Sequence, residues 1–94
     1  MEIKRTASAG TMESSDIMIT VKPSNNGIKI ELKSDVEKQF GNQVKKIIKN
    51  TIEGMGVKNV YIRAQDRGAL DYAIKARTRT ALERASKGAE EIEK

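Results

Sequence analysis

The sequence predicts an α+β domain in which two helices pack on one face of a mainly antiparallel, four-stranded sheet. Short runs that alternate apolar and polar residues indicate strands with one buried face. Two longer runs with apolar residues three and four positions apart indicate amphipathic helices. The elements follow in the order strand, strand, strand, helix, strand, helix. A chain of 94 residues is long enough for a single domain, 1–94, with one core.

Two central strands are expected to form an antiparallel hairpin. Residues 17–22 and 28–33 each alternate apolar with polar side chains. Between them lies Pro23–Gly27, whose proline, asparagines and glycine favour a turn. A further strand is predicted over 59–64, where the apolar positions again alternate. The weaker alternation of residues 2–8 is interpreted as an edge strand.

The first helix is predicted to begin at Ser34–Glu37, which matches a capping box, and to end at Gly54 and Gly56. One stripe of this helix is apolar and is expected to face the core. The stripe consists of Val36, Phe40, Val44, Ile47, Ile48 and Ile52.

The second helix follows a turn at 65–68 and is predicted to end at Gly88. Its stripe has smaller side chains, as expected for a helix close to its neighbours. The stripe consists of Leu70, Ala73, Ile74, Ala81, Leu82 and Ala85. Residues 89–94 are predicted to be a frayed, charged tail.

The composition excludes several kinds of chemistry. The chain has no Cys and no His, so thiol nucleophiles, imidazole bases and the usual soft metal sites are absent. We therefore predict no metal ligand, and any reactive group that the protein handles must be attached to it. No segment approaches the roughly 20 apolar residues of a membrane span, so we expect a cytoplasmic protein without a membrane partner.

The polar segment Gly10–Asp16 is the one stretch that indicates a reactive site. It places two adjacent hydroxyls, Ser14 and Ser15, between the carboxylates of Glu13 and Asp16. Residues of these types are typical of a solvated loop. They also suit a modification site, which requires an exposed hydroxyl on a protruding segment. The residue types alone leave both interpretations open.

The segment Ala9–Asp16 also resembles the attachment segment of the acyl carrier proteins, or gamma subunits, of citrate lyase. Val36–Gly41 resembles the first-helix motif of that family. Asp66–Asp71, followed by Ala76-Arg77 and Arg84-Ala85, resembles its closing strand, turn and helix. The resemblance extends from about Ala9 to Ala85 in the order that the family has.

This resemblance implies a non-catalytic carrier. In that family the serine after Gly-Thr-x-Glu bears the prosthetic group, which assigns the attachment to Ser14, with Ser15 as the rival. The implied group is 2'-(5''-phosphoribosyl)-3'-dephospho-coenzyme A, joined by a phosphodiester and ending in a thiol. The implied partners are the alpha and beta catalytic subunits of citrate lyase and the transferase that attaches the group. Glu13 and Asp16 are then interpreted as recognition elements for that transferase or as residues that order the turn.

Arg77 interrupts the apolar stripe of the second helix, seven residues after Leu70. One interpretation is that its guanidinium meets a nearby acid, namely Asp71, Asp66 or Glu53, while its stem packs. The other is a docking contact or a site for a phosphate of the arm.

Two alternatives to the citrate lyase assignment remain at this point. The carrier of malonate decarboxylase resembles this class in its arm. A small basic RNA-binding module would suit the net charge of +5. Only Phe40, Tyr61 and Tyr72 could stack on bases, however, and Phe40 is expected in the core, so we predict no nucleic-acid partner.

Overall fold

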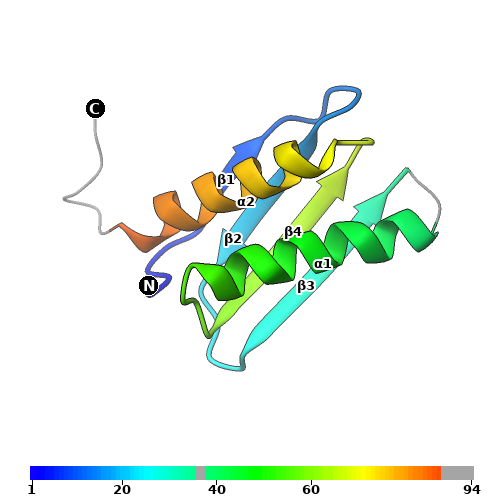
Figure 1. The fold of residues 1–94 in the computed structure, drawn as a ribbon. Helices are drawn as coiled ribbons and strands as arrows, with labels where there is room; N and C mark the ends of the chain where they lie inside the picture. The colour runs from blue at the N-terminus through cyan, green and yellow to red at the C-terminus, as the bar shows by residue number, and fades with distance from the viewer. Residues whose placement is uncertain (36–37, 88–94) are drawn as a thin grey trace.

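The computed structural model describes residues 1–35 and 38–87, and it confirms the α+β class and the order of the elements. Both helices cover one face of a four-stranded sheet (Figure 1). The elements are β1 (Ala7–Gly10), β2 (Ile17–Lys22), β3 (Ile28–Ser34), α1 (Lys38–Gly54), β4 (Val60–Asp66) and α2 (Asp71–Ser86). The predicted tail at 89–94 and the predicted helix end at Gly88 lie outside the described residues.

The strand order is β1-β2-β4-β3, so the predicted hairpin between residues 17–22 and 28–33 is wrong. Strand β4 lies between β2 and β3, antiparallel to β2 and parallel to β3. The sheet is therefore mixed, although two of its three pairings are antiparallel. The cause is α1, which joins β3 to β4 as the crossover that a parallel pair requires. Alternation and turn residues identify strands, but they do not identify neighbours.

Strand β1 is an edge strand, as predicted, but it begins later than the predicted range 2–8. The backbone amides of Lys4 and Arg5 donate to the carbonyl of Ala85 at 2.8 and 3.1 Å. That carbonyl belongs to the last turn of α2, where carbonyls lack partners within the helix. The N-terminal segment therefore pairs with the end of α2 before the chain enters the sheet.

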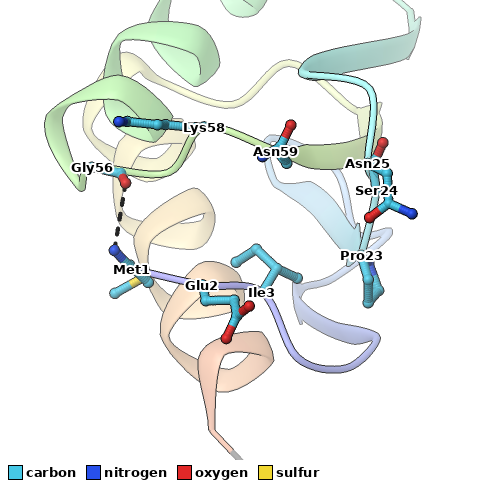
Figure 2. Close-up of a pocket in the computed structure, with 9 residues that line it drawn as sticks. All are labelled: Met1, Glu2, Ile3, Pro23, Ser24, Asn25, Gly56, Lys58 and Asn59. Atoms are coloured by element: carbon cyan, nitrogen blue, oxygen red, sulfur yellow. Dashed lines mark hydrogen bonds between the residues drawn. The ribbon is translucent and has the colours of Figure 1, made fainter.

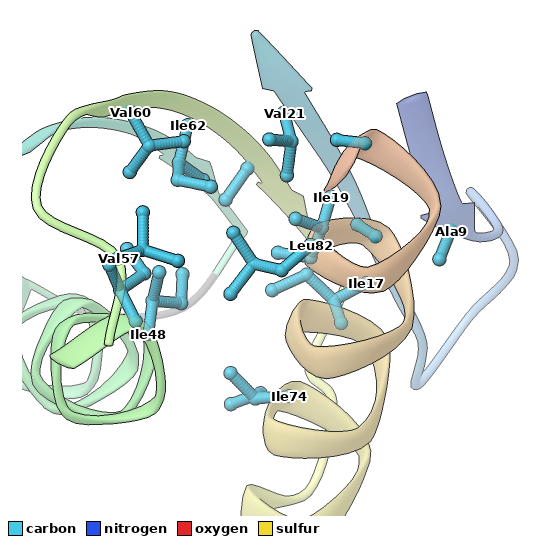
Figure 3. Close-up of a cluster of buried hydrophobic side chains, with 14 of the residues drawn as sticks. Ala9, Ile17, Ile19, Val21, Ile48, Val57, Val60, Ile62, Ile74 and Leu82 are labelled. Atoms are coloured by element: carbon cyan, nitrogen blue, oxygen red, sulfur yellow. The ribbon is translucent and has the colours of Figure 1, made fainter. Parts of the chain in front are cut away.

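The core lies between the sheet and the two helices (Figure 3). Side chains on alternate positions of β2 and β4 point to the helices and are fully buried, as the period of two requires. The fully buried aliphatic side chains of the strands are Ile17, Ile19, Val21, Val60, Ile62 and Ala64, and those of the helices are Ile48, Ile52, Ile74, Ala81, Leu82 and Ala85.

Phe40 and Leu70 were both expected in the core, and both expectations are wrong. Phe40 is 54% exposed and Leu70 is 60% exposed. Phe40 lies in the first turn of α1, and Leu70 is the residue before α2. Both therefore lie at the starts of their helices, at the margin of the core.

The predicted capping box is only partly described, because Val36 and Glu37 lie outside the described residues. Ser34 is the last residue of β3, and its hydroxyl donates to Oδ2 of the buried Asp66 at 3.0 Å. The capping interaction itself stays a prediction.

The topology brings several segments to one end of the domain, which we call the turn end. Strand β1 ends there and β2 begins there, while Ser34 pairs with Asp66 where β3 and β4 end. Both helices begin at the same end, as Figure 1 shows. Met1 lies at the opposite end, where its ammonium contacts the carbonyl of Gly56. The segment Gly10–Asp16 therefore lies at the same end of the domain as the starts of both helices.

Candidate functional site

Gly10–Asp16, which we call the serine turn, joins β1 to β2 at the turn end. The amide of Asp16 donates to the carbonyl of Glu13 at 3.1 Å, which closes a four-residue turn. Ser14 and Ser15 are its two central residues, and both are exposed. Ser15 has a φ of 66°, the left-handed region that glycine or asparagine usually occupies at the third position of a type II turn.

The two serines differ in how their backbones are held. The amide of Ser15 donates to the carbonyl of Arg67 at 2.8 Å, and the amide of Arg67 donates to the carbonyl of Asp16 at 2.9 Å. Ser15 and Asp16, just before β2, thus face the single residue Arg67, just after β4, in the pattern of a β-bulge whose first residue is left-handed. Within residues 1–35 and 38–87, no hydrogen bond involves Ser14. The hydroxyl of Ser15 also makes no hydrogen bond within these residues, so the two serines differ in the backbone contact of Ser15 with Arg67.

Asp16 is the centre of the hydrogen-bond network beneath the turn. Its carboxylate accepts from the hydroxyl of Thr11 at 2.6 Å and from the amide of Ile17 at 2.7 Å. It also accepts from Nε and Nη2 of Arg77 at 3.2 and 2.9 Å. The Thr11 hydroxyl, followed by the Arg77 guanidinium, lowers the pKa of Asp16 from 3.8 to about 2. The carboxylate is thus held ionised and fixes the turn.

Gly10 and Thr11 complete the turn, and neither was selected from the sequence as a site residue. Gly10 has a φ of 100°, and a Cβ at this position would collide with the carbonyl oxygen of Ile17. The Thr11 hydroxyl accepts from the amide of Glu13 at 3.2 Å while it donates to Asp16. A threonine hydroxyl that accepts from the amide two residues later is a recognised turn pattern. The position of Thr11 two residues before Glu13 is therefore the sequence signal that could have identified it.

Arg67 braces the turn from the side of β4, and sequence reasoning also missed it. Its Nη1 donates to the carbonyl of Met12 at 2.9 Å, and its Nε lies 2.6 Å from Oδ2 of Asp35. The neighbouring Asp66 is buried and accepts from the amide of Ala69 at 3.0 Å, which fixes the loop into α2. These contacts hold β4, the serine turn and the start of α2 in one arrangement.

The three predicted recognition residues, Glu13, Asp16 and Arg77, differ from one another in their contacts. Arg77 contacts Asp16 rather than the predicted Asp71, Asp66 or Glu53. Glu13 is exposed, and its carboxylate has no partner in the part of the chain that the structure describes. Asp16 and Arg77 are thus brought together to order the turn, while Glu13 projects from it.

A hollow on the surface, shown in Figure 2, lies away from the serine turn. It is lined by residues from the N-terminus, the β2–β3 connection and the α1–β4 connection. It lies at the end opposite the serine turn, roughly 20 Å away along the six residues of β2.

Among residues 1–35 and 38–87, no group of three acidic, His or Cys side chains could hold a metal ion. No helix of those residues is long and apolar enough to cross a membrane.

Comparisons with known proteins point to one kind of molecule. Residues 4–85 match an acyl carrier protein family model described as malonate decarboxylase delta subunit (MdcD). The chain is 55% identical over 86 residues to the citrate lyase acyl carrier protein of Lacticaseibacillus casei, with 92% of this chain and 85% of the relative covered. It is 58% identical over 85 residues to that of Lactiplantibacillus plantarum, with 90% and 88% covered.

A solved structure has the same fold. A chain in the crystal structure of a Pseudomonas malonate decarboxylase hetero-tetramer in complex with malonate aligns with a TM-score of 0.76. The alignment covers 89% of this chain and 87% of that chain at 18% sequence identity. At this identity the likeness extends to the fold alone.

Proposed function

Because the chain belongs to the citrate lyase acyl carrier protein family, we propose that it is the non-catalytic acyl carrier subunit of a citrate lyase. In this role it carries acetyl and citryl groups between the alpha and beta catalytic subunits while citrate is cleaved to acetate and oxaloacetate. The extent of the match supports this role, because the chain covers 85% and 88% of the length of the two relatives described above.

Ser14 is the proposed attachment residue, and its presentation at the tip of the serine turn is the observation that carries the proposal. A modifying enzyme needs a hydroxyl that it can reach without unfolding the carrier. Ser14 is exposed and makes no hydrogen bond among the described residues, whereas the Ser15 backbone is held against Arg67. The register of the motif and the geometry of the turn therefore favour the same residue.

The residues of the turn fit the proposed group, 2'-(5''-phosphoribosyl)-3'-dephospho-coenzyme A. When bound, this group supplies the thiol that the chain lacks, and that thiol holds the acyl group. The Ser14 hydroxyl supplies the point of attachment, and Asp16 with Arg77 keeps the base of the turn rigid. A flexible arm on a rigid base raises the local concentration of its acyl group at every active site within reach.

The test is co-expression of the chain with the attachment enzymes, followed by intact-mass measurement and peptide mapping. We expect one added mass, located on Ser14. Ser14→Ala should abolish the added mass and leave the fold unchanged, and Ser15→Gly should retain it. A modified Ser15, or no modification of the wild-type chain, would overturn the assignment.

A second candidate is the carrier of a malonate decarboxylase, which the description of the matching family model favours. Reconstitution distinguishes the two. The loaded chain should restore citrate cleavage when it is mixed with citrate lyase catalytic subunits. Restoration of malonate decarboxylation alone, with the corresponding decarboxylase subunits, would favour the second candidate.

A further inference from the structure

The two peptide units that flank Ser14 are both fixed by backbone hydrogen bonds. In the unit before it, the carbonyl of Glu13 accepts from the amide of Asp16 at 3.1 Å. In the unit after it, the amide of Ser15 donates to the carbonyl of Arg67 at 2.8 Å. Because peptide units are planar, the two planes together fix φ and ψ of Ser14, and with them the direction of its Cα–Cβ bond. The Ser14 hydroxyl therefore projects from a backbone of defined orientation.

The peptide unit between Met12 and Glu13 is held at both ends by side chains. Its carbonyl accepts from Nη1 of Arg67 at 2.9 Å, and its amide donates to the hydroxyl of Thr11 at 3.2 Å. Within residues 1–35 and 38–87, these are the hydrogen bonds that this unit makes. The first half of the serine turn therefore depends on the side chains of Thr11 and Arg67.

Thr11 connects this peptide unit to the network beneath the turn. Its hydroxyl accepts from the amide of Glu13 and donates to Oδ2 of Asp16 at 2.6 Å. Asp16 in turn accepts two hydrogen bonds from Arg77 of α2. A hydroxyl can donate and accept at the same time, whereas a methyl group of the same size can do neither. Thr11 thus joins the backbone next to Ser14 to a carboxylate that the second helix holds in place.

We propose that Thr11 is a positioning residue for the attachment of the prosthetic group to Ser14, and that Arg67 supports it by holding the same peptide unit. This inference rests on the proposed function. Thr11 acts through the backbone of Glu13, so that the attaching enzyme meets a turn that already has the shape it binds. The apparent affinity of a partner falls in proportion to the fraction of molecules in the conformation that it binds. Loss of the Thr11 hydroxyl should therefore raise the KM of the enzyme for the carrier and leave kcat nearly unchanged.

The experiment measures initial rates of attachment by the transferase at several carrier concentrations, with the added mass as the readout. Thr11→Val keeps the branched shape, removes the hydroxyl and is expected to raise KM about five- to tenfold. Thr11→Ser keeps the hydroxyl and should restore most of the wild-type KM. Wild-type KM in Thr11→Val would overturn the proposal. So would equal impairment of Thr11→Ser and Thr11→Val, because the branched shape and not the hydroxyl would then matter.

Thr20→Val is the matched control for the loss of a threonine hydroxyl. Thr20 is partly buried, as Thr11 is, but it lies within β2. Its hydroxyl makes no hydrogen bond in the part of the chain that the structure describes. Thr20→Val should therefore leave KM unchanged. Thermal unfolding of each variant shows that it is folded at the temperature of the assay.

An NMR titration of the Asp16 carboxyl group tests the link without the transferase or the arm. The Thr11 hydroxyl is the largest cause of the low pKa of Asp16. In Thr11→Val the pKa should therefore rise from about 2 toward 3.8, and in Thr11→Ser it should stay low. An unchanged pKa in Thr11→Val would mean that the hydroxyl does not hold Asp16, and it would overturn the proposal.

A double variant tests whether Thr11 and Arg67 act on one peptide unit. Arg67→Gln removes the guanidinium but keeps the backbone contact with Ser15, and it should also raise KM. In the double variant with Thr11→Val, the rise should be smaller than the product of the two single rises, because the first change already frees the unit. Rises that multiply would overturn the shared role of Arg67.

The outcome is separable from that of the proposed function. If the wild-type chain receives no group on Ser14, the attachment assignment falls, while the titration of Asp16 still decides whether Thr11 holds the turn. If the wild-type chain is modified on Ser14 and Thr11→Val is modified with the same KM, the attachment site stands and the positioning role falls.

Discussion

Arg77 donates two hydrogen bonds to the carboxylate of Asp16, from Nε at 3.2 Å and from Nη2 at 2.9 Å. The two residues are 61 positions apart, so this pair joins the middle of α2 to the start of β2. A guanidinium that engages both oxygens fixes orientation as well as distance. The rigidity of the serine turn therefore depends on a side chain from the opposite half of the sequence.

Removal of this guanidinium should loosen the turn. Arg77→Gln is expected to lower the free energy of unfolding by about 1 kcal/mol, a modest value because the arginine is partly exposed. Arg77→Lys should recover only part of the loss, since an ammonium does not reproduce the two-donor geometry. Urea denaturation of both variants measures the effect. Arg79→Gln, an exposed neighbour on α2, should be neutral, and an equal loss there would contradict the assignment.

Asp16 should give the domain a defined dependence on pH. Its pKa is about 2 in the folded protein, below the ordinary value of 3.8. Because the folded pKa is the lower one, ionised Asp16 stabilises the fold above its ordinary pKa, and the contribution is lost as the pH falls through about 2. The difference in unfolding free energy between wild type and Asp16→Asn should therefore be constant near neutral pH and should shrink between these two values.

Denaturation series at several pH values measure this difference. Arg77→Gln removes one of the causes of the low pKa, so it should show a smaller change with pH than the wild type shows. A gap between wild type and Asp16→Asn that persists unchanged at the lowest pH would mean that the carboxylate contributes nothing through its charge.

Local patterns in the sequence predicted the elements but not their neighbours. The period of β2 and β4 follows from burial of one face, so both strands could be predicted from Ile17, Ile19 and Ile62 and their alternating neighbours. The insertion of β4 between β2 and β3 depends on the path of α1, which no local pattern encodes. Phe40 and Leu70 fit the helical period, but both are exposed at the starts of their helices, because burial depends on the tertiary packing of each helix and not on its period alone.

The candidate site was predictable to a similar degree. The serine turn and its exposed hydroxyls could be predicted from residue types and from the resemblance, and Arg77 could be singled out as a charge in an apolar stripe. The partner of Arg77 could not be predicted from the sequence, because the contact with Asp16 requires the tertiary fold. The roles of Gly10 and Arg67 could not be predicted either. Gly10 is needed because the Ile17 carbonyl lies close to its backbone, and Arg67 donates to the carbonyl of Met12, which is 55 positions away in the sequence.

Gly10→Ala should damage the turn severely. The added methyl group would collide with the backbone carbonyl of Ile17, and a backbone atom cannot move aside as a flexible side chain does. Gly27→Ala is the matched control, because Gly27 also has a positive φ but its Cβ would meet nothing within 4 Å. We expect Gly27→Ala to cost about 1 kcal/mol and Gly10→Ala at least about 2 kcal/mol more. Equal losses in thermal or urea unfolding would show that the close approach carries no penalty.

Ser15→Gly should stabilise the domain, because glycine adopts a φ of 66° without the steric penalty that serine has there. The expected gain is about 1 kcal/mol, or roughly 4–8 °C in the midpoint of thermal unfolding for a domain of this size. Ser14→Ala is the internal control and should leave the midpoint nearly unchanged, since Ser14 makes no hydrogen bond in the described residues. A lower midpoint for Ser15→Gly would mean that the serine side chain stabilises the left-handed conformation. If the stabilised variant is still modified on Ser14, then the Ser15 side chain is needed neither for the shape of the turn nor for attachment, and the two adjacent hydroxyls have separate roles.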